Sequence, residues 1–463
     1  MLDYLKRTRR VTPAIEAKAR EYLSLGNQRL LTFQCADGGF EWWGKGQGVV
    51  ALTAYGLQEF SAMSGVFDID PRVMVRAREF LFRSQNRDGS WTSAQGTHGS
   101  VPADATQLGL TAYVLWSLLE AGTPANEAHV AGGLSWLAKA APTEDPSLRA
   151  LVALARLSAD RSDRQAQQLL DELVAGRIQK GDLAHWTGGT SVVSYAGGSS
   201  LDIETTATVV LALQKANRDP AVANQALAWL VTQMDSGGTW HSTQATILTL
   251  QALLGSAAGT PGDCTGTAVV RVNGRDAARI QVAPENADLM RQVEASELVH
   301  AGENTVQIAW EGKPGLMAQV VGRWHVPWDA TEGATSAPFA LAVAYDRTQV
   351  AREERIACSV RAENRQDLDS RMVMVCVGTP PGFQVESADL ESLVTAGKVA
   401  KFEQNGREVV LYLDRLGGHE TVELAWHLQA KFAVEARNAP SRIYEYYAPE
   451  RNATAPPQEF QVR

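Results

Sequence analysis

The feature that most constrains this chain is a loop that recurs in its first half and ends on a large aromatic residue. The four copies are Asp37-Gly38-Gly39-Phe40, Asp88-Gly89-Ser90-Trp91, His185-Trp186 and Gly237-Gly238-Thr239-Trp240. They form two pairs, and the members of each pair lie about 50 residues apart. Each copy follows one apolar stretch of helical period and precedes another.

Helices rich in Thr and Ala follow these loops, at Thr53-Ala54, Thr111-Ala112, Thr206-Ala207 and Thr243 to Thr246. A repeat of this length with two helices predicts an array of αα-hairpins, because glycine allows the tight turn and the aromatic side chain covers the hairpin's end. Small Thr and Ala side chains let the inner helices approach closely. We therefore expect an α/α-toroid over residues 1–258.

Composition excludes two classes of protein. The 463 residues carry a net charge of −9 with scattered basic residues, which argues against a nucleic-acid surface. No apolar run reaches the roughly 18 residues of a membrane span. Met1 precedes basic residues without an apolar segment, so we predict no signal peptide in this chain.

A change to two-residue periodicity follows the helical part. The strand Thr267 to Val272 ends in Asn273-Gly274, a strong hairpin signal. Further strands are expected at 277–282, 304–310 and 317–326, which gives a β segment over 262–328. Beyond a small-residue linker, residues 337–463 predict a β-sandwich with one short helix. There the 441–447 stretch suits an edge strand, and we expect a loose tail from Pro456.

Four cysteines are scattered along the chain, at Cys35, Cys264, Cys358 and Cys376, and none has zinc-site spacing. Cys358 and Cys376 flank a polar turn almost symmetrically. They could pair as a disulfide across a hairpin or remain two buried thiols, and the spacing leaves both alternatives open.

Several local motifs accompany this order of parts: Leu2-Asp3-Tyr4-Leu5, Thr12-Pro13-Ala14-Ile15, Asp37-Gly38-Gly39-Phe40, Leu52-Thr53-Ala54-Tyr55, Leu110-Thr111-Ala112-Tyr113, Gly237 to Gln244 and Arg442 to Tyr447. Together they resemble the C-terminal portion of the α2-macroglobulin and complement thioester-protein family. The resemblance implies a thioester-type toroid, the trailing half of a CUB-like domain and a receptor-binding macroglobulin sandwich. It also implies an extracellular or periplasmic endopeptidase inhibitor that traps proteases after bait cleavage and binds a cell-surface receptor.

The chain departs from the family at the thioester. The family motif is Cys-Gly-Glu-Gln, and no cysteine here has glutamine three residues on. The chain is either a fragment that begins just after the thioester or a relative without one. The resemblance places His98 close to a histidine that directs thioester transfer in some members. The family's receptor-binding lysines correspond only to Lys398 and Lys401, and Tyr444, Tyr446 and Tyr447 could form an exposed partner surface.

The alternative is a stand-alone toroid enzyme that acts on an isoprenoid or glycan. Asp68 and Asp70 come nearest to the acidic cluster that such an enzyme needs, and a helix N-cap explains Asp70 better. His185 and His241 could suggest a metal pair, although each more often caps a helix end. The tryptophans suit core packing better than a substrate cavity: Trp42, Trp43, Trp91, Trp116, Trp136, Trp186, Trp229 and Trp240. We predict no enzymatic activity, no cofactor and no metal.

Overall fold

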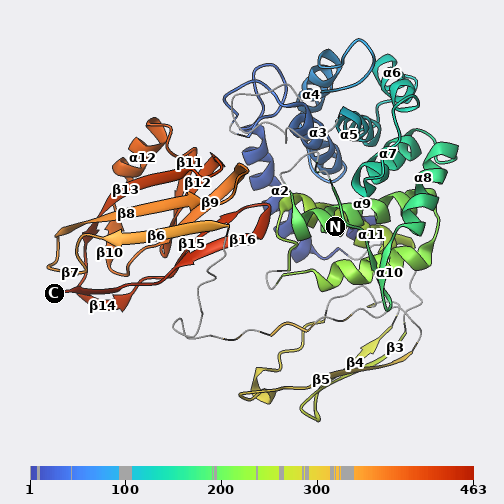
Figure 1. The fold of residues 1–463 in the computed structure, drawn as a ribbon. Helices are drawn as coiled ribbons and strands as arrows, with labels where there is room; N and C mark the ends of the chain where they lie inside the picture. The colour runs from blue at the N-terminus through green and yellow to red at the C-terminus, as the bar shows by residue number, and fades with distance from the viewer. Residues whose placement is uncertain are drawn as a thin grey trace.

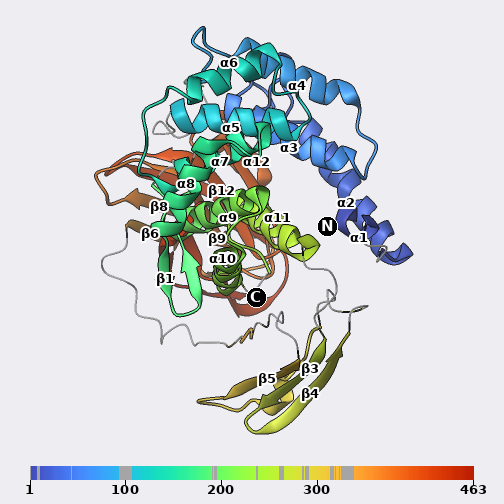
Figure 2. The same ribbon diagram turned by 90° about the vertical axis from the view of Figure 1, so that its right-hand side faces the viewer.

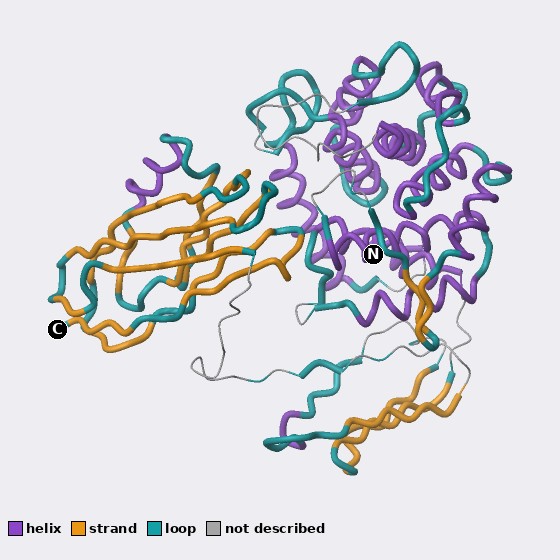
Figure 3. Tube along the Cα trace, in the orientation of Figure 1, coloured by secondary structure: helices purple, strands orange, loops and turns teal. Residues whose placement is uncertain are grey.

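The computed structural model describes residues 2–7, 11–42, 44–92, 107–189, 191, 196–235, 238–259, 265–283, 286, 291–312, 318, 320–322, 324 and 338–463. A helical body, a small sheet and a larger β body follow one another along the chain (Figure 1). The helices gather in the first body and the strands in the other two (Figure 3).

The helical body is an α/α-toroid, as the repeat predicts. Its inner helices contact one another in the order α3, α5, α7, α9 and α11, and α4, α6, α8 and α10 each pack on the inner helix before them. Every residue of α5 from Gly109 to Leu118 is buried, which its position inside the ring requires. The elements are α1 Leu2–Arg7, α2 Pro13–Leu31, α3 Val50–Ser64, α4 Pro71–Arg83, α5 Gln107–Glu120, α6 Ala128–Leu137, α7 Pro146–Ala159, α8 Arg164–Ala175, β1 Ile178–Lys180, β2 Leu183–His185, α9 Gly198–Ala216, α10 Pro220–Thr232 and α11 Thr243–Gly259.

The recurring loops use the aromatic residue to join the helix before it to the helix after it. Its backbone N–H donates to a threonine hydroxyl of the next inner helix, for example from Trp91 to Thr111 Oγ1 at 2.9 Å and from Trp186 to Thr206 Oγ1 at 3.1 Å. The indole N–H of Trp91 donates to the Leu81 carbonyl at 2.8 Å. The same pairs recur as Phe40 with Thr53 and as Trp240 with Thr246 and Leu230. The threonines are therefore hydrogen-bonding partners as well as small residues.

Glycine is required at the turn of the first two of these loops. Gly89 has φ +95°, and a Cβ there would lie 2.5 Å from the Gly132 carbonyl oxygen. Gly38 is alike, with φ +91° and the Arg76 carbonyl oxygen 2.8 Å from a Cβ. Any other residue would combine backbone strain with a clash against the neighbouring hairpin.

The small sheet is antiparallel, has the order β4-β3-β5 and lies apart from the other two bodies (Figure 2). Its strands are β3 Gly266–Val272, β4 Arg275–Val282 and β5 Val306–Gly312, with a 3-10 turn at Ser296–Leu298. Asn273 and Gly274 both have positive φ at the hairpin turn, as predicted. The expected strand at 317–326 is absent at the positions described there, 318, 320–322 and 324.

The last body is a β-sandwich, as predicted. Its main sheets have the orders β10-β13-β8-β6 and β11-β12-β9-β15-β16, and a smaller sheet has the order β14-β17-β7. The elements are β6 Phe339–Tyr345, β7 Gln349–Val350, β8 Arg355–Asn364, β9 Ser370–Gly378, β10 Phe383–Val385, α12 Ser387–Thr395, β11 Lys401–Gln404, β12 Glu408–Leu416, β13 Thr421–Ala430, β14 Val434–Arg437, β15 Ser441–Glu445, β16 Ala448–Ala455 and β17 Glu459–Val462.

Two expectations for this sandwich are wrong. The edge-strand prediction fails because β15 lies between β9 and β16. The tail is not loose, because β17 pairs with β14 and β7 and buries Phe460 in the core.

Of the two alternatives for Cys358 and Cys376, the structure has the buried thiols and no disulfide between them. The turn between them does not make a hairpin, since β8 and β9 belong to different sheets. Cys358 points into the core between the sheets, whereas Cys376 packs with Met374 and Val410 in a separate cluster. The side chains therefore cannot meet.

Candidate functional site between the toroid and the sandwich

The sandwich contacts the toroid through a small apolar cluster, which we call the interface cluster. Ala196 and Leu201 of the toroid and Tyr447 of the sandwich are each less than a tenth exposed there. Trp42, Met372 and Tyr446 pack around them. Figure 1 shows β16 reaching the toroid, where it contacts α9.

Backbone strain on the sandwich side accompanies this contact. Met372, in β9, has φ +49°, a conformation that residues with a side chain rarely adopt. Its carbonyl accepts from the Tyr446 N–H at 2.9 Å, and the pairing register shifts between Tyr444 and Glu445. Irregularities of this kind turn side chains out of the regular alternation. In this strand, the positive φ and the register shift occur where Met372 and Tyr446 pack against Tyr447. The rings of Tyr446 and Tyr447 are edge-to-face, with their centroids 4.9 Å apart.

Polar contacts surround the apolar cluster at the start of α9. The Gly197 N–H donates to the Tyr447 carbonyl at 3.5 Å, and the Ser199 hydroxyl donates to Glu450 Oε2 at 3.4 Å. Asp202, one turn into α9, accepts from the Gly188 N–H at 3.1 Å. Burial raises the pKa of Asp202, and the nearby Glu450 carboxylate raises it further.

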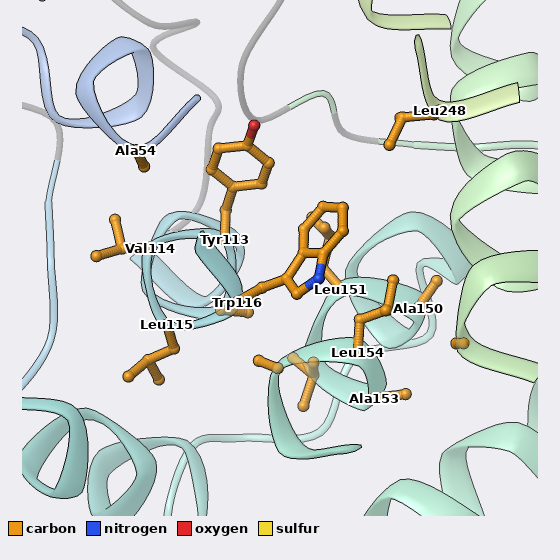
Figure 4. Close-up of a cluster of buried hydrophobic side chains, with 14 of the residues drawn as sticks. Ala54, Tyr113, Val114, Leu115, Trp116, Ala150, Leu151, Ala153, Leu154 and Leu248 are labelled. Carbon is orange, nitrogen blue, oxygen red and sulfur yellow. The ribbon is translucent and has the colours of Figure 1, made fainter. Parts of the chain in front are cut away.

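A small cavity lined by both apolar and polar side chains lies among the inner helices of the toroid, beside the interface cluster. It has a volume of about 40 Å³, and Leu201 belongs both to its lining and to the interface cluster. Tyr113, Trp116, Leu151 and Leu248, drawn in Figure 4, form part of its wall. The remaining lining residues are Ser147, Ser191, Glu204, Thr205, Thr208 and Gln244.

Among the described residues, two buried polar atoms of this cavity have no hydrogen-bond partner, Thr205 Oγ1 and Gln244 Oε1. The Tyr113 hydroxyl lies beside the Gln244 side chain, which lowers the pKa of Tyr113 and so opposes the effect of burial. A cavity of this size and polarity has room for a few water molecules, which would satisfy such atoms. It has no room for an isoprenoid chain. The cavity thus argues against the alternative of a terpenoid-type enzyme.

The cavity wall is poor in positive charge. No Lys, Arg or His is among the lining residues, while Glu204 is buried and accepts from the Ser242 hydroxyl at 3.2 Å. Burial raises the pKa values of Tyr55 and Tyr113, and nearby Glu59 raises both further. Burial also raises the pKa of Glu59 to about 7. This part of the ring therefore favours neutral forms of its acidic groups.

The predicted partner-surface residues lie differently from expectation. Tyr447 is not exposed, because it packs against the toroid, and Tyr444 and Tyr446 are half-buried. Lys398 and Lys401 both follow α12 and do not lie on it. Lys401 pairs with Glu403 at 2.5 Å, and exposed Lys398 donates to the Glu423 carbonyl at 3.3 Å. His98 lies outside the described residues.

Of the residues considered for an enzyme, Asp70 and His185 have structural partners. Asp70 is the N-cap of α4 and accepts from the Arg72 N–H at 3.0 Å. His185 stacks on Trp229 at 4.6 Å, and His241 is exposed just before α11. Trp91, Trp186 and Trp240 are almost fully buried in the core, as expected. Trp43 is not among the described residues.

One group with metal-ligand geometry occurs in the described part of the chain, formed by Glu386, Asp389 and His427. Its members already have partners. Asp389 Oδ2 accepts from the His427 N–H at 2.8 Å and lies 2.7 Å from His427 Nδ1, and Glu386 pairs with Arg355. We therefore assign these residues to fastening α12 onto β13.

Sequence reasoning missed the toroid side of the interface and Glu450. One signal was present, because β9 contains the continuous apolar run Met372 to Val377. A strand with one solvent-exposed face alternates apolar and polar residues, whereas a continuous apolar run indicates that both faces of the strand are covered. A second signal is the Gly197-Gly198 pair at the start of α9, which lies outside the recurring loops.

Comparisons with known proteins agree with this arrangement. The model of the A-macroglobulin TED domain matches residues 1–255, and that of the A-macroglobulin receptor binding domain matches residues 368–457. The chain is 27% identical over 484 residues to ovostatin of Gallus gallus, covering 98% of this chain and 32% of ovostatin.

Two solved structures share the fold. Salmonella alpha-2-macroglobulin reacted with methylamine gives a TM-score of 0.67 at 18% identity, covering 98% of this chain and 28% of that one. The native conformation of E. coli alpha-2-macroglobulin gives 0.67 at 16% identity, covering 99% and 28%. The chain thus spans about a third or less of the length of these relatives. Within its described residues, no helix has the length and apolar character to span a membrane.

Proposed function

The chain belongs to the A-macroglobulin family, and we propose that it forms the C-terminal part of an endopeptidase inhibitor that traps its target after bait cleavage. The matches to the toroid and receptor-binding models support this role. Under this proposal the chain's partners are target proteases, reached through the complete protein, and a cell-surface receptor. The site of action is extracellular or periplasmic, and the chain itself is no enzyme.

The proposal divides the chain into three parts. Residues 1–258 form the thioester-type toroid, residues 262–328 the trailing half of a CUB-like domain, and residues 337–463 the receptor-binding sandwich. Among the described residues, the edge strands β4 and β5 have no further strand beside them, which supports the reading of the small sheet as half a domain, because a complete sandwich would pair or cover its edges.

The observation that carries the proposal is the docking of the sandwich on the toroid. Each body has its own large core, whereas the contact between them buries three apolar residues. A contact of that size can open without unfolding either body. A trapping protein needs such a joint, because cleavage at one place must produce a conformational change at another.

The test compares this chain with the product of the full reading frame that contains it. This chain alone should leave trypsin-, elastase- and subtilisin-type proteases active and should incorporate no methylamine, because it has no Cys-Gly-Glu-Gln segment. The longer protein should form complexes with these proteases that contain this chain. Trapping by this chain alone, or none by the longer protein, would refute the proposal.

A pair of variants of the longer protein tests the part played by the joint. Tyr447→Ala removes the sandwich's contribution to the interface cluster and should change the rate of trapping. Phe432→Ala removes a side chain that is 68% exposed on the same sandwich and should leave the rate unchanged. If both variants trapped proteases at the same rate, trapping would not depend on this contact.

A further inference from the structure

The polar side chains that line the toroid cavity bring oxygen atoms together from four inner helices. Tyr113 comes from α5, Ser147 from α7, Glu204 and Thr205 from α9, and Gln244 from α11. These groups are a phenol, two hydroxyls, a carboxylate and an amide. Oxygen atoms of carboxylates, amides and hydroxyls are the ligands that hard cations prefer.

Two of these side chains are deeply buried and have an oxygen atom without a hydrogen-bond partner among the described residues. Gln244 is 8% exposed and Thr205 is 1% exposed, and the unpartnered atoms are Oε1 and Oγ1. Burial raises the pKa of Tyr113, and the Gln244 side chain beside the phenol opposes this rise. Only the amide nitrogen can donate to the phenol, so Oε1 is the end of the amide that remains for another ligand.

The chain also leaves room at the Thr205 hydroxyl. A Cβ at Gly188 would lie 2.2 Å from Thr205 Oγ1, so any side chain at position 188 would cover that oxygen. About one turn further along α9, the Thr208 hydroxyl donates to the Glu204 carbonyl at 2.7 Å. Its proton is therefore in use, and its oxygen can act only as an acceptor or as a ligand.

Glu204 places a negative charge beside these oxygen atoms. It is 8% exposed, and its Oε1 accepts from the Ser242 hydroxyl at 3.2 Å. A hydroxyl donor leaves the charge of the carboxylate in place. No Lys, Arg or His is among the described residues that line the cavity. A buried carboxylate among acceptor oxygens favours a ligand with positive charge over water, because water supplies hydrogen bonds but no charge.

We propose that this cavity binds one monovalent cation, sodium or potassium, with the Glu204 carboxylate, Gln244 Oε1 and the Thr205 hydroxyl as ligands. The single carboxylate among the described lining residues matches a single positive charge, whereas calcium sites combine more carboxylates. The volume of about 40 Å³ has room for an ion and a coordinated water. The ion links α9 to α11 and stabilises the ring. This inference goes beyond trapping, because it concerns the toroid alone.

Thermal unfolding of this chain in three chloride salts tests the proposal. Far-UV circular dichroism of the helices gives the midpoint in choline chloride, NaCl and KCl at one ionic strength, so that screening is equal. Choline is too large for the cavity. Sodium or potassium should raise the midpoint in a saturable way, by about 3–6 °C at about ten times its Kd. Equal midpoints in the three salts would overturn the proposal and leave water as the content of the cavity.

Variants of the proposed ligands locate the effect. Glu204→Gln removes the charge and Gln244→Met removes Oε1, and both should lose the rise in midpoint. Thr205→Val is a milder change that should weaken it. Gln251→Met, exposed on α11, is the matched control and should keep the full rise.

Each variant is compared with itself in choline chloride, so a general loss of stability does not enter the result. If Glu204→Gln does not fold, Gln244→Met and Thr205→Val still test the site. A full response to sodium or potassium in Gln244→Met, or its loss in Gln251→Met, would show that the ion does not bind in this cavity. The trapping assay does not enter this test.

Discussion

The tryptophans that end three of the recurring loops, Trp91, Trp186 and Trp240, are called plugs here because each closes the end of a hairpin. Replacing each plug by phenylalanine should destabilise the toroid unequally, and most at Trp186. Trp91, Trp186 and Trp240 are 0%, 1% and 2% exposed, so each substitution removes a similar volume from a closed core. Each also removes an indole N–H that donates to the last turn of the preceding helix. The substitutions differ in whether the carbonyl that loses the indole N–H keeps another hydrogen-bond donor.

The Leu81 carbonyl keeps a second donor, the Ser84 N–H at 3.2 Å, and the Leu230 carbonyl keeps the Gln233 N–H at 3.1 Å. The Leu173 carbonyl has Trp186 Nε1 at 2.7 Å as its only donor among the described residues. An unpaired buried carbonyl costs about 1–3 kcal/mol, whereas a hydrogen bond lost with a replacement in place costs about 0.5–1.5 kcal/mol. We therefore expect Trp186→Phe to lower the free energy of unfolding by about 1 kcal/mol more than the other two.

Urea unfolding followed by the far-UV circular dichroism of helices measures this difference, because nearly all of the helix lies in the toroid. The three variants serve as controls for one another, since the loss of ring volume is common to them. The reasoning is refuted if Trp186→Phe is no less stable than Trp91→Phe and Trp240→Phe, because ring volume alone would then explain the plugs.

Two further predictions concern groups whose pKa is raised by burial. Glu59 has a pKa of about 7 in the folded protein and 4.5 as its ordinary value, so the folded state favours the protonated carboxyl group. The free energy of unfolding therefore falls as the pH rises from 4.5 through about 7. Thermal melts should show Glu59→Gln gaining up to about 3 kcal/mol over the wild type at about pH 8 and little at about pH 4; parallel pH profiles would contradict this. Burial raises the pKa of Cys358 to about 12, so iodoacetamide should label it slowly in the native protein and rapidly in urea, and fast native labelling would show that the thiol is accessible.

The toroid could be predicted from the sequence because its signal is local and repeated. Each loop ends in its own aromatic plug, three of the four contain a turn glycine, and the next inner helix supplies the threonine that binds the plug, about 20 residues away for Trp91 and Trp186. A pattern that recurs several times leaves few other folds. The helix cap at Asp70 was predictable for the same reason, since a cap and its helix are neighbours in the chain.

The joint between the bodies has no such local signal. Tyr447 stands in a stretch that alternates like an edge strand, and its partner Leu201 lies far away in the sequence. Likewise, Cys358 and Cys376 are placed symmetrically about a turn, yet the chain crosses from one sheet to the other between them. A turn alone does not distinguish a hairpin from a crossover, because strand pairing is decided by the rest of the sheet.

The covered faces of the sandwich nevertheless explain why the joint should be closed at rest. Tyr446 packs against both the interface cluster and the neighbouring cluster of Met374, Cys376 and Val410, so one apolar surface continues from β9 to the toroid. Opening the joint would expose Tyr447 and Leu201 to water and leave α9 without Glu450. Burial of apolar area opposes this opening and is worth only about a few kcal/mol for a cluster of this size. A contact that buries three apolar residues is small beside the core of either body, so it could open while both bodies stay folded.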